Sequence, residues 1–509
     1  MVADTIPVSD SFGVVLDAGS SGTRLRIFRW QPPPAHTLPQ MREVRMPLPG
    51  DADPLRRRPG FSSFAHQPEL AAEQTLSLVD QARNWVPLEQ QPRTPLFLKA
   101  TAGLRLLPIL QANAIIGSVR QALSNRSLCP FLFKGARVIS GEEEALFGWL
   151  SINHLLGVLE GPPERRVGWL DLGGASAQLA AELSEDSHSQ AETSIELVRL
   201  PRETVKLFRV SHLRFGREEA FRRTCRSLAR GGAGGDTLWR AITPRRKLQS
   251  GLGLGLQSHY FSARGAGKSS DFRRAHPCLT LGDEVRMIMS GPASMAVGPA
   301  PHGPAPHGLS GEARKGEARK GERTEWTFYG TGDAAGCEAM VRKLMPPAAV
   351  CSAWSGTGCA AGLSATQRSP TKSFYGAGNY YYTAKQLERS LSGKMAPGSL
   401  NVSASDYWNH AKRMCAQPWA ETKAAWSESE WRHVRYGCFS GLYISELLHT
   451  GHGLPAKAKL VSVARSYDGT IVDWTLGSMI HEHLQTTEVA KAPDPRPQIP
   501  DPRPQTPDP

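Results

Sequence analysis

The sequence predicts an α/β protein with two similar lobes, and two observations support this fold class. First, the short apolar segments 13–16 and 168–170 each lead into an aspartate and a glycine-rich turn. Second, strand-like and helix-like patterns alternate around both turns. The two aspartates, Asp17 and Asp171, are 154 residues apart, so each turn can belong to its own lobe. A chain of 509 residues is long enough for two or three domains.

The first half of the chain contains the elements of one such lobe. Residues 11–30 predict a β-hairpin with the glycine turn at its tip, because apolar strand-forming residues stand on both sides of the glycines. Residues 69–85 and 109–123 have apolar side chains at helical spacing and predict amphipathic helices. Between them, residues 95–105 predict a buried strand that ends in a turn of small residues.

The second lobe begins with the same order of elements. A strand near residues 136–139 leads into a helix over 141–156, whose first turn contains three consecutive glutamates. Residues 169–183 then repeat the strand, the glycine turn and the strand. This repetition is the strongest internal sign of a duplicated architecture.

The two glycine turns are suited to phosphate and a metal ion. Glycine lets the backbone turn tightly, so that successive N–H groups point at one anion, and serine or threonine hydroxyls add further donors. An aspartate at the start of the turn is a suitable ligand for a hydrated Mg²⁺ or Ca²⁺. An aspartate in such a turn also stabilises the turn by itself, but two turns in matching contexts favour a phosphate-binding function.

The net charge of +13 is concentrated in one segment. Residues 201–280 contain 17 Lys or Arg against 5 Asp or Glu, without a regular alternation of basic and aromatic residues or a recognisable nucleic-acid-binding module. We interpret the excess as a solvated basic face and expect no nucleic-acid partner. Attraction of anionic nucleotides is a further interpretation.

Cysteine usage favours an oxidising compartment. The eight cysteines show no metal-binding spacing, and the even number and late clustering favour disulfides. Sequons at Asn125 and Asn401 agree with this. The first ten residues lack the pattern of a secretory signal, and no run of about 18 apolar residues occurs. We therefore expect the sequence to be part of a longer anchored or secreted protein.

Two segments have low complexity. Residues 298–323 contain partial repeats rich in Gly, Pro, Glu and Lys, and residues 487–509 end in a Pro-Asp-Pro-Arg-Pro-Gln repeat. Such segments bury too little apolar surface to offset the entropy of ordering. They predict a disordered insertion and a disordered tail.

Taken together, the motifs resemble the nucleoside triphosphate diphosphohydrolase (apyrase) family, closest to its animal cell-surface branch. Five blocks occur in the order of that family: D-A-G-S-S-G-T-R from Asp17, A-T-A-G-L-R from Ala100, G-E-E-E-A-L-F-G-W from Gly141, D-L-G-G-A-S-A-Q from Asp171, and W-T-L-G from Trp474. The resemblance implies an actin-like, RNase-H-type ATPase fold of two lobes, with the active site in the cleft between them. It places lobe I at residues 12–140, completed by 465–486, and lobe II at 141–464.

The resemblance also implies roles for individual residues. Glu144 aligns with the general base that activates water, and Thr101, Ser176 and Gln178 with residues that position that water or the waters of the metal. Asp17 and Asp171 hold hydrated Mg²⁺ or Ca²⁺. The phosphate-binding residues of the two turns are Ser20, Ser21, Gly22, Thr23, Gly173, Gly174, Ala175 and Ser176.

Helix geometry limits the choice among the three adjacent glutamates. Neighbouring side chains on a helix diverge by about 100°, so at most one of Glu142, Glu143 and Glu144 faces the water. Acidic residues are also common in a first helical turn for electrostatic reasons alone. The resemblance selects Glu144 and suggests that Arg105 braces the site rather than contacting phosphate.

The base pocket and the disulfides are also taken from the resemblance. Residues 374–382 resemble an aromatic strand of the family, so Tyr381 and Trp474 are expected to stack on the nucleobase; cross-strand packing is the alternative. The implied disulfides pair Cys278 with Cys337, Cys351 with Cys359 and Cys415 with Cys438, and they leave Cys129 and Cys225 unassigned. Ala145 and Gly22 stand where relatives often carry Gly and His, and neither change removes a chemical role.

The resulting prediction is a divalent-cation-dependent enzyme that hydrolyses the terminal phosphates of nucleoside tri- and diphosphates. It is expected outside the cell, either secreted or membrane-anchored through segments that this sequence lacks, and able to form oligomers. Alternatives are a nucleoside diphosphatase of the secretory lumen, a sugar-kinase-like or polyphosphate-handling ATPase, and a catalytically inactive nucleotide-binding protein. The glutamate of the third block and Gln178 favour water over a bound hydroxyl group as the nucleophile.

Overall fold

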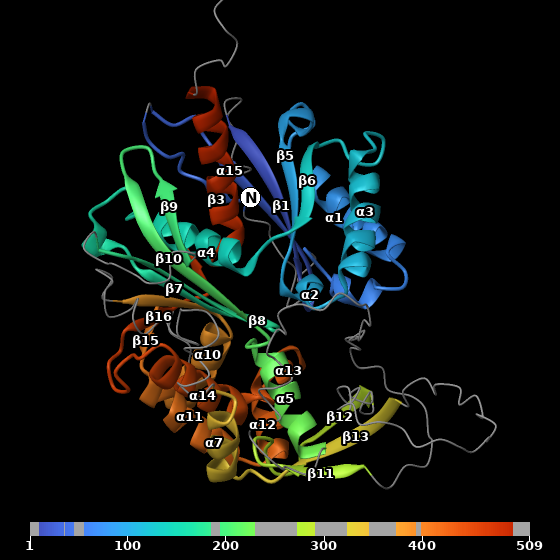
Figure 1. Ribbon diagram of the computed structural model, residues 1–509, viewed down its shortest axis with the longest axis vertical. Helices are drawn as coiled ribbons and strands as arrows, with labels where there is room; N and C mark the ends of the chain where they lie inside the picture. Colours follow the sequence, from blue (N-terminus) through green and yellow to red (C-terminus); the bar gives the residue numbers. More distant parts are fainter. Residues whose placement is uncertain are drawn as a thin grey trace, which may run out of the picture.

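The computed structural model describes residues 10–34, 36–44, 55–184, 194–229, 272–290, 323–345, 373–392 and 399–491. It contains two large mixed sheets, one in each lobe (Figure 1). The first sheet has the order β3-β2-β1-β5-β6, with β4 paired to β2. Its strands are β1 Ser11–Gly19, β2 Gly22–Trp30, β3 Arg42–Glu43, β4 Arg56–Arg57, β5 Pro95–Ala100 and β6 Leu132–Val138.

The second sheet has the order β15-β16-β14-β7-β8-β10-β9. Strands β7 and β8 form the second hairpin, as predicted, and β14 lies parallel to β7 on its other side. Its strands are β7 Gly168–Leu172, β8 Ser176–Glu182, β9 Ile195–Arg199, β10 Thr204–Leu213, β14 Phe374–Gly378, β15 Leu400–Val402 and β16 Val461–Val463.

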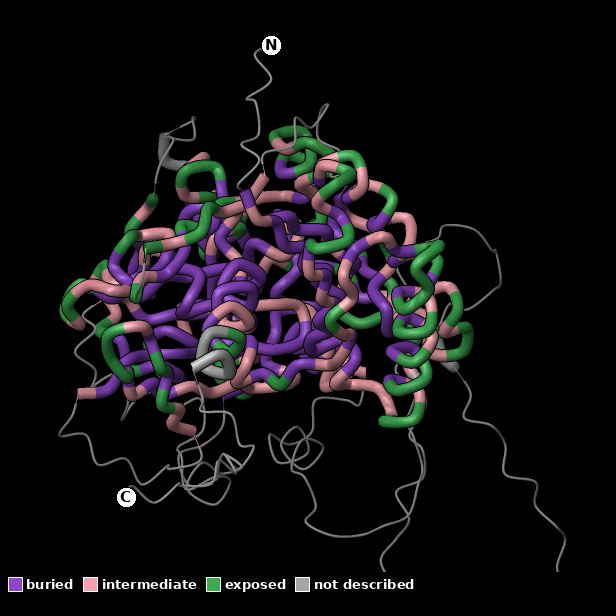
Figure 2. Tube along the Cα trace, turned by 90° about the horizontal axis from the view of Figure 1, so that it is seen from above, coloured by how far each residue is buried: buried purple, intermediate pink, exposed green. Residues whose placement is uncertain are grey.

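Helices separate and cover the sheets in five layers. On the outer face of the first sheet lie α1 Glu69–Arg83 and α3 Ile109–Ser124, which share an apolar core with β1, β2 and β5. Between the sheets lie α4 Gly141–Leu155 and α15 Trp474–Lys491, which pack against each other. The far face of the second sheet is covered by α5 Arg217–Ala229, α10 Asn379–Ser392, α11 Ala404–Ala416 and α14 Gly437–Glu446. Buried residues fill the centre of the molecule (Figure 2).

Two glycines allow the central layer to pack closely. A Cβ atom on Gly477 of α15 would lie 1.8 Å from the carbonyl oxygen of Phe147 in α4, and one on Gly148 would lie 2.1 Å from the Trp169 ring. The two helices and β7 therefore approach each other where only hydrogen fits. This explains why glycine ends the W-T-L-G block and precedes the tryptophan of the third block.

The remaining elements are the 102–105 helix and the 466–471 strand pair, which contact the first lobe, and a small arm and the rim of the second lobe. A three-stranded sheet, β11-β13-β12, extends from the far end of that lobe (Figure 1). These elements are β11 Arg273–His276, β12 Glu284–Ser290, β13 Arg323–Gly330, the two-stranded pair β17 Ser466–Tyr467 and β18 Thr470–Ile471, and helices α2 Ala102–Arg105, α7 Ala334–Arg342, α12 Trp419–Ala425 and α13 Glu428–Val434.

The α/β class and the two-lobed architecture are confirmed, while two local expectations need correction. Residues 374–382 are not one aromatic strand: β14 ends at Gly378, and α10 begins at Asn379. Helix α15 continues to Lys491, so the first residues of the predicted tail are helical. Most of the predicted insertion 298–323, the residues beyond 491 and the Cys351–Cys359 pair lie outside the described residues.

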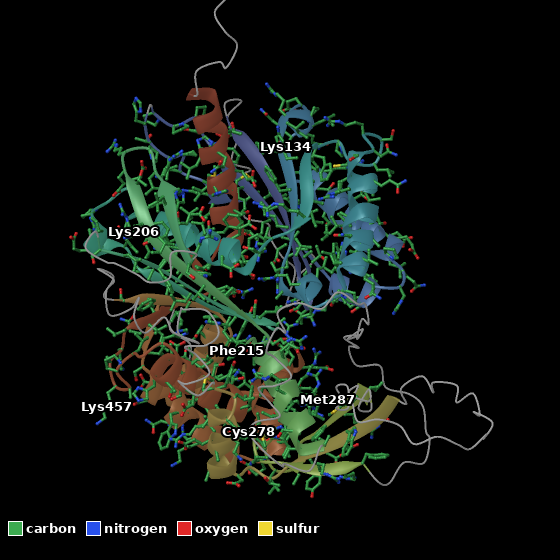
Figure 3. All side chains as sticks on the ribbon, viewed as in Figure 1. Lys134, Lys206, Phe215, Cys278, Met287 and Lys457 are labelled. Atoms are coloured by element: carbon green, nitrogen blue, oxygen red, sulfur yellow. A yellow bond between two sulfur atoms is a disulfide. The ribbon has the colours of Figure 1, made fainter. Side chains whose placement is uncertain are left out.

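Two of the predicted disulfides are present. Cys278 bonds to Cys337 and Cys415 to Cys438, both inside the core of the second lobe; Cys278 is labelled in Figure 3. Cys129 and Cys225 are free, buried thiols. Within the described residues, no helix is long and apolar enough to span a membrane.

Candidate active site

The first glycine turn closes the hairpin of β1 and β2 with only Ser20 and Ser21 outside the ladder, since Gly19 pairs with Gly22. Gly22 has a φ of 149°, which L side chains rarely adopt, and a Cβ there would lie 2.4 Å from the carbonyl of Arg57. Asp17 is 4% exposed and accepts a 2.7 Å hydrogen bond on Oδ2 from Arg24, its cross-strand partner. The turn thus requires glycine at position 22, and Arg24 holds the Asp17 carboxylate.

The second glycine turn joins β7 to β8. The carbonyl oxygens of Gly173, Gly174 and Ala175 accept hydrogen bonds of 2.9, 3.1 and 2.7 Å from backbone N–H groups at residues 217, 219 and 214. The Gly173 N–H donates to the carbonyl of Ser176 at 3.0 Å inside the turn. Because the turn's carbonyls are bonded to the start of α5 and the loop before it, we expect the N–H groups of Gly174 and Ala175 to point the other way.

The two turns meet between the lobes. A Cβ on Gly174 would lie 2.8 Å from Ser20 Oγ, and Cβ atoms on Gly60 and Gly103 would lie 2.4 and 2.9 Å from the Ser20 backbone. Thr101 is 5% exposed and follows β5, where its N–H bonds to the carbonyl of Ala18 in β1. The structure therefore brings the residues of the first, second and fourth sequence blocks to one place.

Glu144 lies at the start of α4 and faces this place. Its Oε2 accepts hydrogen bonds from Arg105 Nη2 and, at 3.3 Å, from Gln178 Nε2. Gln178 Nε2 also lies 2.6 Å from Ser176 Oγ and 3.1 Å from Ser211 Oγ. Burial raises the pKa of Glu144 to about 7, although the Arg105 charge opposes this shift. Glu144, Gln178 and Ser176 therefore form one buried polar cluster.

Glu143 has a different position. With Ser140 it forms the capping box of α4, and its two carboxylate oxygens bind the Arg137 guanidinium at 2.6 and 2.9 Å. Glu143 thus stabilises the helix end, whereas Glu144 points between the lobes. Arg105 contacts Glu144, and its bracing role stays a prediction.

The carboxylates around the two turns are suited to a divalent cation held through water. Within the described residues, no three His, Cys, Asp or Glu side chains form a group that could bind a metal ion directly. However, Asp17 Oδ1 and Gln178 Oε1 are buried and lack a hydrogen-bond partner there. Asp171 stands opposite Gln178 in the β7–β8 ladder. Hard oxygen donors of this kind match hydrated Mg²⁺ or Ca²⁺.

The same carboxylates repel one another. Burial and the charges of Glu144, Asp473 and Asp17 raise the pKa of Asp171 to about 8, and burial also raises the pKa of Asp17. A bound cation relieves this repulsion. Near neutral pH, Asp171 should therefore be largely protonated in the folded, metal-free protein, whereas in the unfolded chain the same carboxyl group is ionised.

This predicts a pH-dependent stability. Above about pH 7 the buried histidines, whose pKa values are lowered to about 4 or below, contribute little to the pH dependence. The raised pKa of Asp171 then makes the free energy of unfolding fall as pH rises from 7 to 8.5, by about 1 kcal/mol or more. Thermal unfolding with EDTA should show this fall, and Ca²⁺ should remove it. A metal-free melting temperature that rises over this range would contradict the prediction, and Asp171→Asn should flatten the curve.

The two predicted base-binding residues lie on different elements. Tyr381 is half-buried on α10, with its ring centroid 5.4 Å from that of Tyr382. Trp474 is 5% exposed and packs against Phe147, at 6.4 Å between ring centroids. The strand ends at Gly378, which has a φ of 62°, and a Cβ there would lie 2.6 Å from Asp171 Oδ1. The helix then starts at Asn379, whose side-chain amide donates to the carbonyl of Leu172 at 2.8 Å. Tyr381 is therefore two residues from Asn379, which binds the carbonyls of Leu172 and Gly173 at the second glycine turn.

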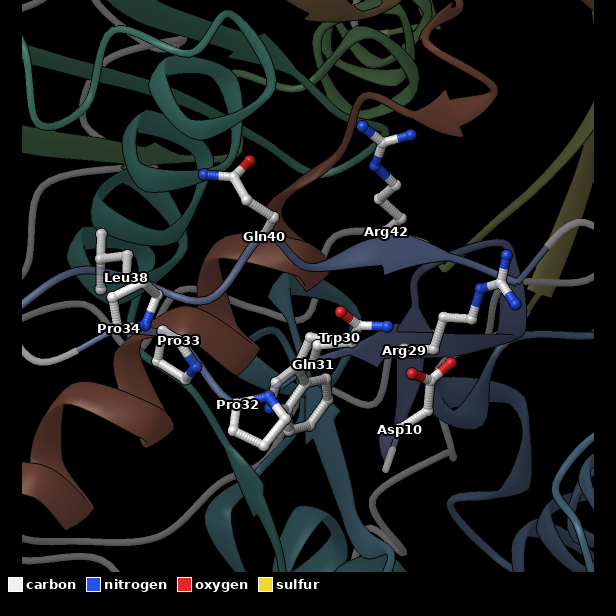
Figure 4. Close-up of a pocket in the computed structure, with 10 residues that line it drawn as sticks. All are labelled: Asp10, Arg29, Trp30, Gln31, Pro32, Pro33, Pro34, Leu38, Gln40 and Arg42. Atoms are coloured by element: carbon white, nitrogen blue, oxygen red, sulfur yellow. The ribbon is translucent and has the colours of Figure 1, made fainter. Parts of the chain in front are cut away.

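A pocket of about 400 Å³ lies away from these residues (Figure 4). It is at the opposite end of the first hairpin, where Trp30 pairs with Ser11. Its lining residues are Asp10, Arg29, Trp30, Gln31, Pro32, Pro33, Pro34, Leu38, Gln40 and Arg42. None of the predicted site residues is among them.

The sequence interpretation missed the charged residues that surround the aspartates. Arg24 belongs to the first block, and its place opposite Asp17 in a hairpin was a usable signal. Asp473 directly precedes Trp474, but its nearness to Asp17 and Asp171 has no local signal. Ser211, which contacts Gln178, comes from β10 and carries no motif.

Sequence and structure comparisons show which known proteins this chain is similar to. The model of the GDA1/CD39 (nucleoside phosphatase) family matches residues 4–268 and 304–493. Ectonucleoside triphosphate diphosphohydrolase 8 of Mus musculus is 29% identical over 94% of this chain and 83% of its own. Nucleoside-diphosphatase mig-23 of Caenorhabditis briggsae is 25% identical over 92% of this chain and 76% of its own. The solved structure of nucleoside triphosphate hydrolases from Neospora caninum has a TM-score of 0.54 at 17% identity, covers 95% of this chain and 94% of its own, and supports the fold.

Proposed function

This chain belongs to the GDA1/CD39 (nucleoside phosphatase) family of nucleotide-hydrolysing enzymes, and from this premise we propose that it removes the terminal phosphate of nucleoside tri- and diphosphates with an activated water and Mg²⁺ or Ca²⁺. One observation carries this proposal more than any other: a buried carboxylate with a raised pKa, Glu144, shares a hydrogen-bond cluster with Gln178 and Ser176 beside two converging glycine turns.

In the proposed reaction Glu144 is the general base. It takes a proton from a water molecule that Gln178, Ser176 and Thr101 position in line with the terminal phosphorus. The water oxygen bonds to phosphorus while the bond to the bridging oxygen breaks, and the shortened nucleotide leaves. A carboxylate with a pKa of about 7 is a stronger base than an ordinary glutamate and is still ionised in half of the molecules at neutral pH.

The two glycine turns are proposed to bind the phosphate chain. The first turn supplies Ser20, Ser21, Gly22 and Thr23, and the second supplies Gly173, Gly174, Ala175 and Ser176. Arg56 from β4 binds Ser21 Oγ at 2.6 Å and so holds one hydroxyl while adding positive charge beside the turn. When bound, the divalent cation, held through waters by Asp17 and Asp171, neutralises charge on the phosphate oxygens.

We propose base stacking as the source of nucleotide affinity, with Tyr381 as the main contact and Trp474 as the second. Tyr381 is the more accessible of the two, and stacking tolerates different bases. Tyr381→Ala should raise KM for ATP about tenfold with a smaller effect on kcat, since a stacked base is worth about 1–3 kcal/mol. Steady-state kinetics test this, with inorganic triphosphate as the control substrate because it has no base to stack. An equal loss with both substrates would contradict the stacking role.

The cellular setting follows from the relatives and the cysteines. Two disulfides in the core of the second lobe favour an oxidising compartment, so we propose that the protein acts at the cell exterior or in the secretory lumen. Its partners are then nucleotides rather than nucleic acids. Arg217 and Arg223 of the basic segment 201–280 are buried, so these two side chains do not belong to the expected solvated face.

The test is release of inorganic phosphate from ATP, ADP, GDP and UDP by the purified protein with Mg²⁺ or Ca²⁺, and then with EDTA. Metal-dependent release from both ATP and ADP is expected. Release from GDP and UDP alone would favour a lumenal diphosphatase, a function that the worm relative's name supports. Nucleotide binding without release would overturn the hydrolase assignment.

A further inference from the structure

Asp473 is a carboxylate near the predicted cation site that no sequence motif assigns. It lies just before α15 and accepts a 3.2 Å hydrogen bond from Arg26 Nε on Oδ2. Arg26 is two residues from Arg24 on β2, so both side chains lie on the same face of the sheet about 7 Å apart. Arg24 holds Asp17 and Arg26 holds Asp473. The carboxylates of Asp17 and Asp473 are therefore neighbours. The fold brings them together across a long stretch of sequence, since 447 residues separate Arg26 from Asp473.

The charge of Asp473 reaches both predicted metal-holding aspartates. It adds to burial in raising the pKa of Asp17 and of Asp171. The side chain of Asp473 is 23% exposed, so water can reach it, unlike that of Asp17 at 6%. Asp473 thus combines closeness to the site with access to solvent.

A second observation points to a ligand here. Gln178 is 2% exposed, and its Oε1 has no hydrogen-bond partner in the described part of the chain, although its Nε2 has three close oxygen neighbours. Asp17 Oδ1 is also buried and unpartnered there. Buried oxygens without donors are costly unless a metal ion, or water bound to one, supplies positive charge.

The ion pairs around the site leave an excess of negative charge. Arg24 pairs with Asp17, Arg26 with Asp473 and Glu43, and Arg105 with Glu144. With Asp171 included, five carboxylates face three guanidinium groups in this network.

We propose that Asp473 is a third outer carboxylate of the divalent-cation site, which accepts a hydrogen bond from a metal-bound water and so positions the hydrated ion. This rests on the proposed function, because it presumes that Asp17 and Asp171 hold the same ion. Asp473 acts through that water and is a positioning residue rather than a catalytic one.

A purely structural role is the alternative, since Asp473 also caps α15. Its Oδ1 accepts a 2.9 Å hydrogen bond from Thr475 N and another from the Thr475 hydroxyl. Asparagine caps a helix about as well as aspartate and still accepts from Arg26, but it carries no charge. Asp473→Asn therefore removes the negative charge and keeps the helix cap.

The experiment measures binding of Mn²⁺ alone by EPR of the free ion, in the wild type, Asp473→Asn and Asp473→Ser. Asp333→Asn is the matched control, because Asp333 caps α7 in the far part of the second lobe. Loss of one charge at this range should weaken Mn²⁺ binding about tenfold in both Asp473 variants, while the control binds as the wild type does. Asp473→Asn binding within twofold of the wild type would overturn the proposal.

Further measurements distinguish a variant that misfolds, a metal that is coordinated directly, and a failure of the proposed function. Circular dichroism checks that each variant folds, and serine, a good N-cap, replaces asparagine if that variant does not. Water-proton relaxation of Mn²⁺ bound to the wild type should show that most water ligands remain; direct coordination by several carboxylates would overturn the outer-sphere role without any variant. A wild type that hydrolyses ATP without binding or needing metal would overturn the cation premise of the proposed function itself.

Discussion

Glu144→Gln should reduce kcat for ATP hydrolysis about 10³-fold while leaving KM within a few-fold of the wild type, because general-base catalysis typically contributes 10²–10⁴. Glutamine keeps the shape of the side chain but cannot accept the proton of the attacking water. In the wild type, kcat should fall as pH decreases through about 7, since the base must be ionised and its pKa is raised to about 7. Phosphate release measured from pH 5.5 to 8.5 checks both statements.

Glu143→Gln is the matched control for this experiment, since it makes the same chemical change one residue earlier. Glu143 caps α4 and binds Arg137, so this variant should lose some stability and keep kcat. Equal losses of kcat in the two variants would contradict the assignment of the base. If Glu144→Gln kept wild-type activity, the water would have to be activated by another group.

Asp171→Asn should lower kcat/KM for metal–ATP about 10²-fold or more and raise the metal concentration needed for half-maximal activity. The expected loss reflects weaker charge stabilisation of the phosphoryl group, for which metal ions supply several kcal/mol. Asp171 suits this test better than Asp17, whose carboxylate also holds Arg24. Activity is measured as a function of Mg²⁺ and Ca²⁺ concentration, and high metal should restore part of it.

Asp283→Asn is the control for the cost of altering a buried aspartate. Asp283 is 1% exposed, its pKa is raised to about 6 by burial, and it pairs with Arg435 at 3.1 Å in the far part of the second lobe. This variant should lose stability without a change in the metal requirement. An Asp171→Asn enzyme with the wild-type metal requirement would remove Asp171 from the cation site.

Much of the fold is visible in consecutive residues. The hairpin at residues 11–30 and the helices near 69–85, 109–123 and 141–156 follow from apolar spacing, which one segment displays by itself. The change from β14 to α10 was missed because the aromatic run 374–382 is compatible with a strand. Contacts of Gly378 and Asn379 with the β7 turn, more than 200 residues away, decide where the strand ends.

The candidate site, like the fold, has features that the local sequence predicts and features that only packing determines. The glycine turns and their aspartates are recognisable locally, because the backbone requirements of a tight anion-binding turn select glycine within a few residues. The separation of Glu143 from Glu144 depends on Arg137 and Arg105, which lie on different elements. Adjacent helical positions differ in direction, and only packing decides which direction faces the reaction.

By itself, the sequence determined the two glycine turns, the α/β class and the family resemblance, since these depend on residue types at short spacing. The tertiary structure alone decided that Ser20 meets Gly174, that Arg26 joins Asp473 across 447 residues, and that Trp474 is largely buried against Phe147. Such contacts depend on how the layers pack. Because electrostatic coupling acts through space and not along the chain, the charge balance of the site exists only in the folded protein.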